Sequence, residues 1–558
     1  MLKQIFNKKI MLIAFILMLL VAIPSSFAED SSAIDNSTLT LAESSISSVD
    51  YQSGYQPADG NNDLNNYQTS DNQDEAGTNN IGAIDNAGSE NQKSSNSNAD
   101  ILSDGGSWTV QESGTVYASL SDAVAYAQSG NTIIGLANGE TISNITISKD
   151  LTIKAENLGD VVLKTSGTSA FTVSKGSNLY LTNIVFKDYY LTSNVRGGVV
   201  NNNGNLSLTN CNISNIRAVS DKNYGGAIYC EDNTNLTIID SYFENITASD
   251  APIYLSSTNA VINGTIFRNV KSSNSASAVY MFGSRVAIEN SKFMDSSISK
   301  EMIYSTKSTL NIISSEFRNL SGSCQATALY TTYYANATVF NCTFDSLKST
   351  ISSNTYNAAG AIYSTGNYIN ISYSTFKDCN QTGVTSSSAR YICGAVLADE
   401  GDVSYCMFIN NNRNPSSSQA HAYDDLYLES GTADNNYWGS NAGPDEGMTN
   451  KADSISSWYI LAMDPAEATA GYDCEITFNL NKINSSGSII DGDNLKDINL
   501  TVMPLLSTNE SFELAVSSGT GSILYQSADA GDETLSLKGV DDKFEFVVNA
   551  DPYASIYV

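Results

Sequence analysis

The stretch LTIIDSYFENI at residues 236–246 returns along the chain with the same pattern. Close copies read AVINGTIFRNV at 260–270, VAIENSKFMDS at 286–296 and LNIISSEFRNL at 310–320. In each copy an alternating apolar strand leads through an aromatic residue into a polar turn. The aromatic column recurs about every 27 residues, with Ile213 replacing phenylalanine in one copy. Its phenylalanines are Phe186, Phe243, Phe267, Phe293, Phe317, Phe344, Phe376 and Phe408.

A second, shorter strand lies between the copies. It reads GGAIY at 225–229, APIYL at 251–255 and SAVYM at 277–281. Periods of about 20–50 residues indicate a solenoid or an array, and these lack the 3.6-residue periodicity of helical repeats. A propeller blade needs four strands in about 40–45 residues, more than one period holds. We therefore predict an all-β chain in which residues 106–460 form a right-handed parallel β-helix.

The residue two places after the aromatic column is most often asparagine or aspartate. These two residue types tolerate left-handed backbone geometry and form hydrogen bonds with their own backbone. The column therefore predicts a stack of turns, whose asparagines include Asn215, Asn245, Asn269, Asn319 and Asn410. Past the last copy, a motif that we expect to close the β-helix contains Asn436, Tyr437, Trp438 and Gly439.

The regions before the repeats are of different kinds. Basic residues, an apolar run at 10–23 and a small-residue cleavage pattern predict a signal peptide at 1–28. Residues 29–105 are rich in Ser, Asn and Asp, which predicts a disordered linker. Helical spacing of Leu120, Ala123, Val124 and Ala127 then predicts a short helix that covers the open end of the solenoid, with Ser121 as its cap.

Residues 465–558 carry spaced strands without the aromatic column, which predicts all or part of a small Ig-like β-sandwich. After cleavage of the signal peptide we expect no membrane-spanning segment. An even count of eight cysteines in an exported chain permits disulfides. Seven of them lie in the repeats, so we interpret them mainly as small core residues, with one or two disulfides left open.

The repeats resemble known surface proteins. Gly-Gly-Ala-Ile at 225–228, alternating with Phe-x-Asn at 243–245, 267–269 and 317–319, resembles the polymorphic membrane proteins of chlamydiae. With the signal peptide, the closing motif and the Ig-like segment, the chain is more similar to the adhesin-like surface proteins of methanogenic archaea. That resemblance implies a secreted or cell-surface protein that attaches to cells or polysaccharide, with a surface glycan or protein as its partner.

The main alternative is a polysaccharide lyase or hydrolase of the same fold, and another is a non-catalytic carbohydrate-binding module. A glycoside hydrolase needs two facing carboxylates, whereas Asp424 and Asp425 are adjacent on the chain and only His421 stands near them. We therefore predict no catalytic site and no cofactor. The segment Asp399-Glu400-Gly401-Asp402 is the one stretch that we consider for Ca²⁺, as a loop.

Two further features bear on the partner. Tyrosines recur on the short strand. We interpret them mainly as packing residues, and a ladder that stacks on sugar rings is the alternative. Frequent Asn-x-Ser/Thr sequons in the repeats predict a glycoprotein, although an asparagine in the turn column would be less accessible. A net charge of −31 excludes a nucleic-acid partner, which requires a basic surface.

Overall fold

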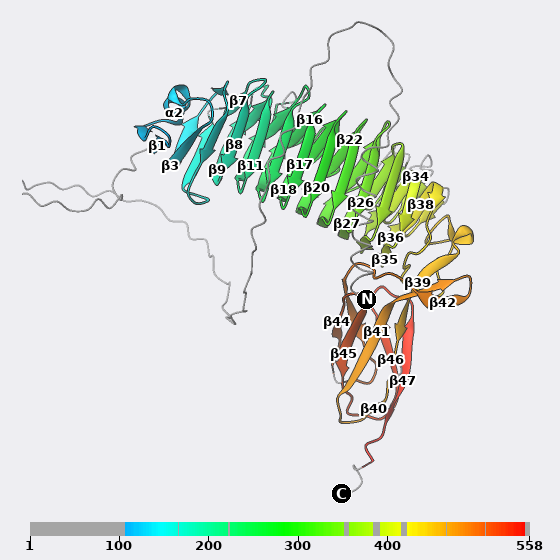
Figure 1. Cartoon of the computed structure of the whole chain (residues 1–558). Coiled ribbons are helices and arrows are strands. Elements are labelled where there is room, and N and C mark those ends of the chain that lie inside the picture. Colours follow the sequence, from blue (N-terminus) through cyan, green and yellow to red (C-terminus); the bar gives the residue numbers. More distant parts are fainter. Residues whose placement is uncertain are drawn as a thin grey trace, which may run out of the picture. The chain divides into compact units, whose positions relative to one another are not determined.

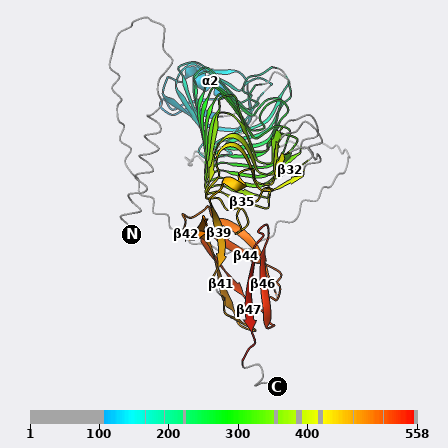
Figure 2. The same ribbon diagram turned by 90° about the vertical axis from the view of Figure 1, so that its right-hand side faces the viewer.

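The computed structural model describes residues 107–552, except 166, 193, 221–223, 351–356, 383–390, 415–420, 465 and 508. The predicted signal peptide and linker lie outside these residues. The larger part of the described chain is a right-handed parallel β-solenoid of about ten turns (Figure 1). Each turn contributes a strand to three columns, and Figure 2 shows the solenoid turned by 90°.

The first column holds the short strands, paired in parallel from one turn to the next. It comprises β4 (Ile145–Ile147), β7 (Phe171–Val173), β10 (Val200–Asn202), β13 (Ile228–Cys230), β16 (Ile253–Ser256), β19 (Val279–Phe282), β22 (Ile303–Thr306), β25 (Leu329–Thr332), β29 (Ile362–Thr365), and the first halves of β34 (Val396–Ser404) and β38 (Leu426–Thr432).

The second column holds the alternating strands, and it ends in the second halves of β34 and β38. It comprises the first part of β3 (Asn131–Ile142), then β5 (Leu151–Lys154), β8 (Asn178–Thr182), β11 (Asn205–Thr209), β14 (Asn235–Ile239), β17 (Asn259–Asn263), β20 (Arg285–Glu289), β23 (Thr309–Ile313), β26 (Asn336–Phe340) and β30 (Tyr368–Ser372).

The third column carries the phenylalanines and leads into the long loops that return to the first column. It comprises the end of β3, then β6 (Val161–Thr165), β9 (Ile184–Leu191), β12 (Asn212–Ala218), β15 (Tyr242–Ala248), β18 (Ile266–Ser272), β21 (Lys292–Ile298), β24 (Glu316–Gly322), β27 (Thr343–Thr350), β31 (Thr375–Lys377), β32 (Asn380–Thr382), β35 (Met407–Ile409) and β36 (Asn412–Asn414).

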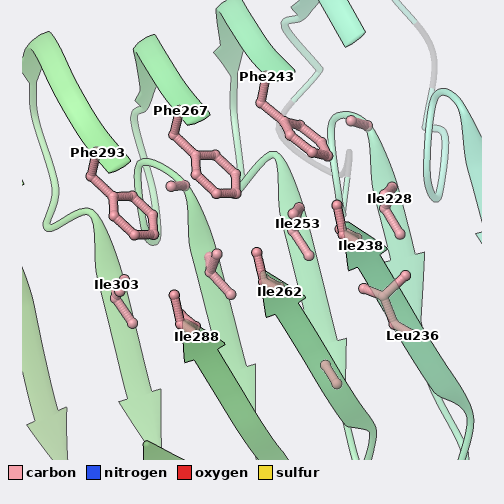
Figure 3. Packing of buried hydrophobic residues seen from close by; sticks show 14 of the residues in the cluster. Ile228, Leu236, Ile238, Phe243, Ile253, Ile262, Phe267, Ile288, Phe293 and Ile303 are labelled. Atoms are coloured by element: carbon pink, nitrogen blue, oxygen red, sulfur yellow. The ribbon is translucent and has the colours of Figure 1, made fainter. Parts of the chain in front are cut away.

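The phenylalanine column forms a continuous row of buried rings in the core. Phe243, Phe267 and Phe293 point from the third column toward the apolar side chains of the other two columns (Figure 3). From Phe243 to Phe408 successive ring centroids lie 4.7–5.2 Å apart with interplanar angles of 1–18°. This distance equals the spacing of neighbouring strands, so parallel pairing alone brings each ring onto the next. Phe186 is buried as well and meets Phe171 edge to face.

The asparagine column lies within the third column of strands. Asn215, Asn245, Asn269, Asn319 and Asn410 all have φ between 48° and 56°, the left-handed region that asparagine tolerates better than most residues. Their side chains form hydrogen bonds from turn to turn: Nδ2 of Asn245 donates to Oδ1 of Asn215 at 3.3 Å, and Nδ2 of Asn269 donates to Oδ1 of Asn245 at 2.8 Å. Each asparagine therefore bends its own strand and binds its neighbour.

A column of small polar residues runs through the interior where the second and third columns meet. Its members are Cys211, Ser241, Thr265, Ser291, Ser315, Cys342, Ser374 and Cys406. The Ser291 hydroxyl accepts from the backbone N–H of Thr265 at 3.2 Å and donates to the carbonyl of Glu289 at 2.8 Å. Three cysteines thus stand where other turns carry Ser or Thr. All eight cysteines are free thiols in the structure.

The closing motif supplies the last members of two columns. Trp438 stacks on Phe408 at 4.9 Å with an interplanar angle of 12°, so it ends the aromatic column. Asn436 ends the small polar column: its Oδ1 accepts from the N–H of Cys406 at 2.8 Å and its Nδ2 donates to the carbonyl of Val403. Tyr437 is fully buried. Gly439 adopts φ of 71°, and its carbonyl accepts from the N–H of Asp541.

The N-terminal elements are β1 (Ser107–Val110), β2 (Thr115–Tyr117) and the helix α2 (Leu120–Tyr126). Leu120, Ala123 and Val124 are buried in the same hydrophobic cluster as the solenoid interior. The helix is capped by Ser119, whose Oγ accepts from the N–H of Asp122 at 3.1 Å. The prediction of Ser121 as the cap was wrong, because the chain already turns into helix two residues earlier.

The C-terminal part forms two further sheets. One contains β39 (Ser457–Met463), β41 (Cys474–Ser485), β42 (Ser488–Asp491) and β45 (Thr520–Tyr525), and the other contains β40 (Ala468–Thr469), β43 (Ile498–Met503), β44 (Phe512–Val516), β46 (Gly531–Leu537) and β47 (Lys543–Asn549). Apolar side chains of both sheets share one buried cluster. Within the described residues, no helix has the length and apolar character that crossing a membrane requires.

Candidate functional site: an outward column of tyrosines

The second residue of each strand from β13 to β29 in the first column points away from the core, because the residues on either side of it point inward. Parallel register places these second residues directly above one another. In consecutive turns they are all tyrosines. This outward column, the tyrosine column, consists of Tyr229, Tyr254, Tyr280, Tyr304, Tyr330 and Tyr363.

Most neighbours in the tyrosine column have nearly parallel rings. Centroids lie 4.6 Å apart for Tyr254 and Tyr280 and 5.4 Å apart for Tyr280 and Tyr304, with interplanar angles of 21° and 8°. Burial against the neighbouring rings and loops raises the pKa of the phenol groups of Tyr254 and Tyr280. These hydroxyls therefore stay protonated and act as hydrogen-bond donors at any physiological pH.

The tyrosine column is interrupted at one step. Tyr304 and Tyr330 meet at 89° with centroids 5.2 Å apart, and beyond them Tyr330 and Tyr363 are again parallel at 6°. Two sets of parallel rings that meet at a right angle cannot both lie face to face along one axis. On at least one side of this break, ring faces are therefore turned away from the column axis.

A cavity of about 420 Å³ opens at this break. Tyr280, Tyr304 and Tyr330 line it from the first column of strands. Thr332 and the exposed Tyr333 also line the cavity. The loops that enter these strands add the polar residues Asn274, Ser275, Lys300, Glu301 and Gln325. The volume lies in the range of small-molecule sites, and polar groups make up most of the exposed wall.

Glu301 is the unusual residue of the cavity. It lies two residues before β22, and the matching positions before β16, β19, β25 and β29 hold small residues: Ala251, Ser277, Thr327 and Gly360. Only 5% of Glu301 is exposed. Desolvation by burial raises the pKa of its carboxyl to about 7, although the backbone N–H groups of Glu301 and Gln325 and the charge of Lys300 oppose this rise. The carboxyl is therefore a protonatable group at neutral pH.

A small additional sheet covers the first column beyond the cavity. It is formed by β28 (Asn357–Ala359), β33 (Tyr391–Cys393) and β37 (His421–Tyr423), which extend the loops of three successive turns. Tyr391 stacks on Tyr427 with centroids 4.2 Å apart, and Tyr363 and Tyr427 are only 5% and 6% exposed. Tyr254, Tyr280, Tyr304 and Tyr330 remain partly exposed, so the accessible part of the tyrosine column lies before this sheet.

The carboxylates singled out in the sequence lie elsewhere. Asp425 is buried and accepts a hydrogen bond from Nδ2 of Asn411 at 2.9 Å, while half-buried Asp424 faces Nε of Arg413 at 3.4 Å. Burial raises the pKa of both carboxyls. His421 is exposed and stacks on Tyr391 at 5.7 Å. Asp424 and Asp425 line a cavity of about 190 Å³ together with Asn410, Trp438 and Asp541, and His421 is not part of its lining.

The segment proposed for calcium is not a loop, and that expectation was wrong. Asp399, Glu400 and Asp402 lie within β34, where alternation sends the side chains of Asp399 and Glu400 to opposite sides of the strand. Asp402 instead accepts hydrogen bonds from Thr432, at 3.0 Å from its N and 2.6 Å from its Oγ1, and from the Tyr368 hydroxyl. Among the residues that the structure describes, no group of three or more His, Cys, Asp or Glu is placed to hold a metal ion.

Sequence reasoning noted the tyrosines of the short strand but missed the break and Glu301. The signal for Glu301 is present in the repeats: a glutamate appears in a column that holds small residues in the neighbouring turns, among them Ser277, Thr327 and Gly360. The break between Tyr304 and Tyr330 has no such signal, because the residue type does not change there.

The fold and this face define a β-helical protein with an outward aromatic column. No protein-family model matches the chain, and no curated protein matches it either. Among solved structures it is similar to the Dettilon tailspike protein gp208, at 10% identity over 73% of this chain and 87% of that chain, with a TM-score of 0.30.

Two other solved structures have comparable likeness. The A-module of the mannuronan C-5 epimerase AlgE6 of Azotobacter vinelandii is 13% identical over 57% of this chain and 92% of the module, with a TM-score of 0.27. The tailspike protein of the E. coli bacteriophage HK620, in complex with a pentasaccharide, is 9% identical over 77% of this chain and 89% of that one, with a TM-score of 0.23. Likenesses this remote do not bear on function, which has to be argued from the site.

Proposed function

We propose that this protein is a secreted or cell-surface adhesin-like protein that attaches to polysaccharide through the tyrosine column. The observation that carries the proposal is the cavity at the break between Tyr304 and Tyr330. It combines aromatic side chains with hydroxyl, amide, ammonium and carboxyl groups. Sugars present apolar ring faces together with many hydroxyls, and this combination of walls complements both.

The repeat also favours a long polymer as the ligand. The partly exposed tyrosines from Tyr254 to Tyr330 recur at the spacing of the turns, so one chemical surface is offered several times along the solenoid. A polymer that engages several such positions gains affinity from each contact without needing a deep pocket. Attachment therefore requires no catalytic group on this face.

The remaining parts of the proposal concern export and architecture. Residues 1–28 would direct secretion, α2 would cover the first turn of the solenoid, and the two C-terminal sheets would be an Ig-like module. We also propose surface glycosylation at sequons outside the side-chain ladders. Asn336 and Asn370 are exposed sequons of this kind, whereas Nδ2 of Asn245 is already a donor to Asn215.

The test is to apply the purified exported protein to an array of plant, microbial and host glycans and to measure both retention and released sugar. We expect retention of at least one polysaccharide without new reducing ends or unsaturated products. Release of products would favour the lyase or hydrolase alternative. No retention on any glycan, with binding to a surface protein instead, would contradict the polysaccharide proposal.

A further inference from the structure

We propose that the cavity between Tyr280 and Tyr333 is an anchoring subsite for sugar units of an uncharged glycan chain, with Tyr304 and Tyr330 as its aromatic floor and Glu301 and Gln325 as its polar wall. This inference rests on the proposed function and adds two things to it. It places the strongest contact at one turn of the solenoid, and it selects neutral over acidic polysaccharides.

The location follows from ring geometry. In the parallel parts of the tyrosine column each ring is flanked by its neighbours at 4.6–5.4 Å. At the break the 89° angle between Tyr304 and Tyr330 turns ring faces away from the column axis, and the cavity lies there. A sugar ring needs an accessible aromatic face for stacking, so this step of the column is better suited to it than the others.

The polar wall lies beside the same step. Glu301 and Gln325 belong to the loops that enter β22 and β25, the two strands that carry Tyr304 and Tyr330. A carboxyl and an amide both pair well with sugar hydroxyls, since each offers acceptor oxygens and the amide also donates. A buried carboxyl that pairs with a hydroxyl of the ligand loses little, whereas an unpaired one is costly.

The charge distribution favours an uncharged ligand. The chain carries a net charge of −31, so a polyanion is repelled before it reaches the surface. At the cavity, the carboxyl of Glu301 becomes negative as the pH rises through about 7, and Asp250 lies outside the lining, near Tyr254 and Tyr280. Among the residues lining the cavity, Lys300 is the one cation, so the preference for neutral chains rests on the net negative charge of the chain.

The experiment compares neutral chains (β-glucan, mannan and chitin oligosaccharides) with polygalacturonate and alginate on the full exported protein. Affinities are then measured for the wild type and for Tyr330→Ala, Gln325→Ala and Tyr242→Ala. Tyr242 is an exposed tyrosine on β15 in the third column, so it controls for the loss of any surface tyrosine. Gln325→Ala removes a loop amide and tests the cavity should Tyr330→Ala fail to fold.

We expect binding of a neutral chain, weakened about tenfold or more by Tyr330→Ala and several-fold by Gln325→Ala, with Tyr242→Ala unchanged. Preference for polygalacturonate or alginate overturns the inference. Binding of a neutral chain that both cavity variants leave unchanged overturns the anchoring subsite while the attachment function stands. No binding of any glycan by the wild-type protein overturns the attachment function itself, and the subsite with it.

Discussion

Two aromatic columns run through the same turns of this solenoid, one inside and one outside. The inner column of phenylalanines is parallel from Phe243 to Phe408, within 18° at every step, and continues into Trp438. The outer column of tyrosines has the same spacing, but it turns by 89° between Tyr304 and Tyr330. Backbone register is common to both, so the difference arises from the surroundings of the rings.

Close packing explains the inner column. A ring in the interior is surrounded on all sides, and one orientation repeated in every turn fills the space best. A tyrosine on the outer face is confined only by its neighbours in the column and by the loops, and those loops change in length and sequence between turns. Packing therefore forces the ring orientation to repeat in every turn inside the solenoid, but it leaves the orientation free to change on the outer face. A specific site is expected at the turn where the orientation of the outer rings changes.

The largest expected difference between the columns is in stability. Phe293→Ala removes a fully buried ring between two parallel neighbours and should lower the free energy of unfolding by about 3–5 kcal/mol. Tyr280→Ala removes a ring that is half solvated and should cost roughly 1 kcal/mol. Urea unfolding followed by circular dichroism measures both.

A control for ring size in this experiment is Phe293→Leu, which keeps most of the buried volume and should cost less than the alanine variant. If Phe293→Ala and Tyr280→Ala lowered the free energy of unfolding equally, the difference between a closely packed inner column and a loosely confined outer column would be contradicted.

The next largest effect concerns pH at the break. The pKa of Glu301 is raised from 4.5 to about 7, because burial disfavours the charged carboxyl. A folded-state pKa above the unfolded value means that the stabilising contribution is complete below pH 4.5 and is lost as the pH rises through 7. Glu301→Gln should therefore match the wild type at pH 4 and be more stable at pH 8, by up to about 3 kcal/mol.

Thermal unfolding of both proteins between pH 4 and pH 8 measures this difference. The groups that share the surroundings of Glu301 are Lys300, Cys324, Tyr304 and Tyr330. The pKa values of Cys324 and Tyr304 are raised, so neither becomes charged in this range. A wild-type protein that is at least as stable at pH 8 as the Gln variant would show that the carboxyl is not buried as described.

The repeats in the sequence predict the interior better than the exterior. The parallel β-helix follows from the period of the phenylalanines, since a column of buried residues fixes the register of the strands that carry them. The break at Tyr330 and the additional sheet of β28, β33 and β37 could not be predicted. Both depend on how loops of variable length pack on the outer face, and a repeat constrains only what recurs in every turn.

The cysteines illustrate the same limit. Their residue type suggested core positions but left disulfides open, and only the structure shows that Cys211, Cys342 and Cys406 occupy the small polar column. Burial raises the pKa of the Cys211 thiol to about 11 and those of Cys342 and Cys406 to about 12. These thiols therefore stay protonated, and their sulfur atoms lie near the carbonyl oxygens that Ser hydroxyls meet in other turns.

The smallest expected effect on stability concerns the column of small polar residues that contains Ser291. Ser291→Ala leaves the buried N–H of Thr265 without the hydroxyl that it donates to, and should cost about 1–3 kcal/mol. Ser291→Cys should cost less, because three turns of the same column already hold cysteine. Urea unfolding of the two variants in a reducing buffer measures the difference. If Ser291→Cys were as damaging as Ser291→Ala, the column would require a hydroxyl at this turn, and the cysteines would need an explanation other than their fit to the interior.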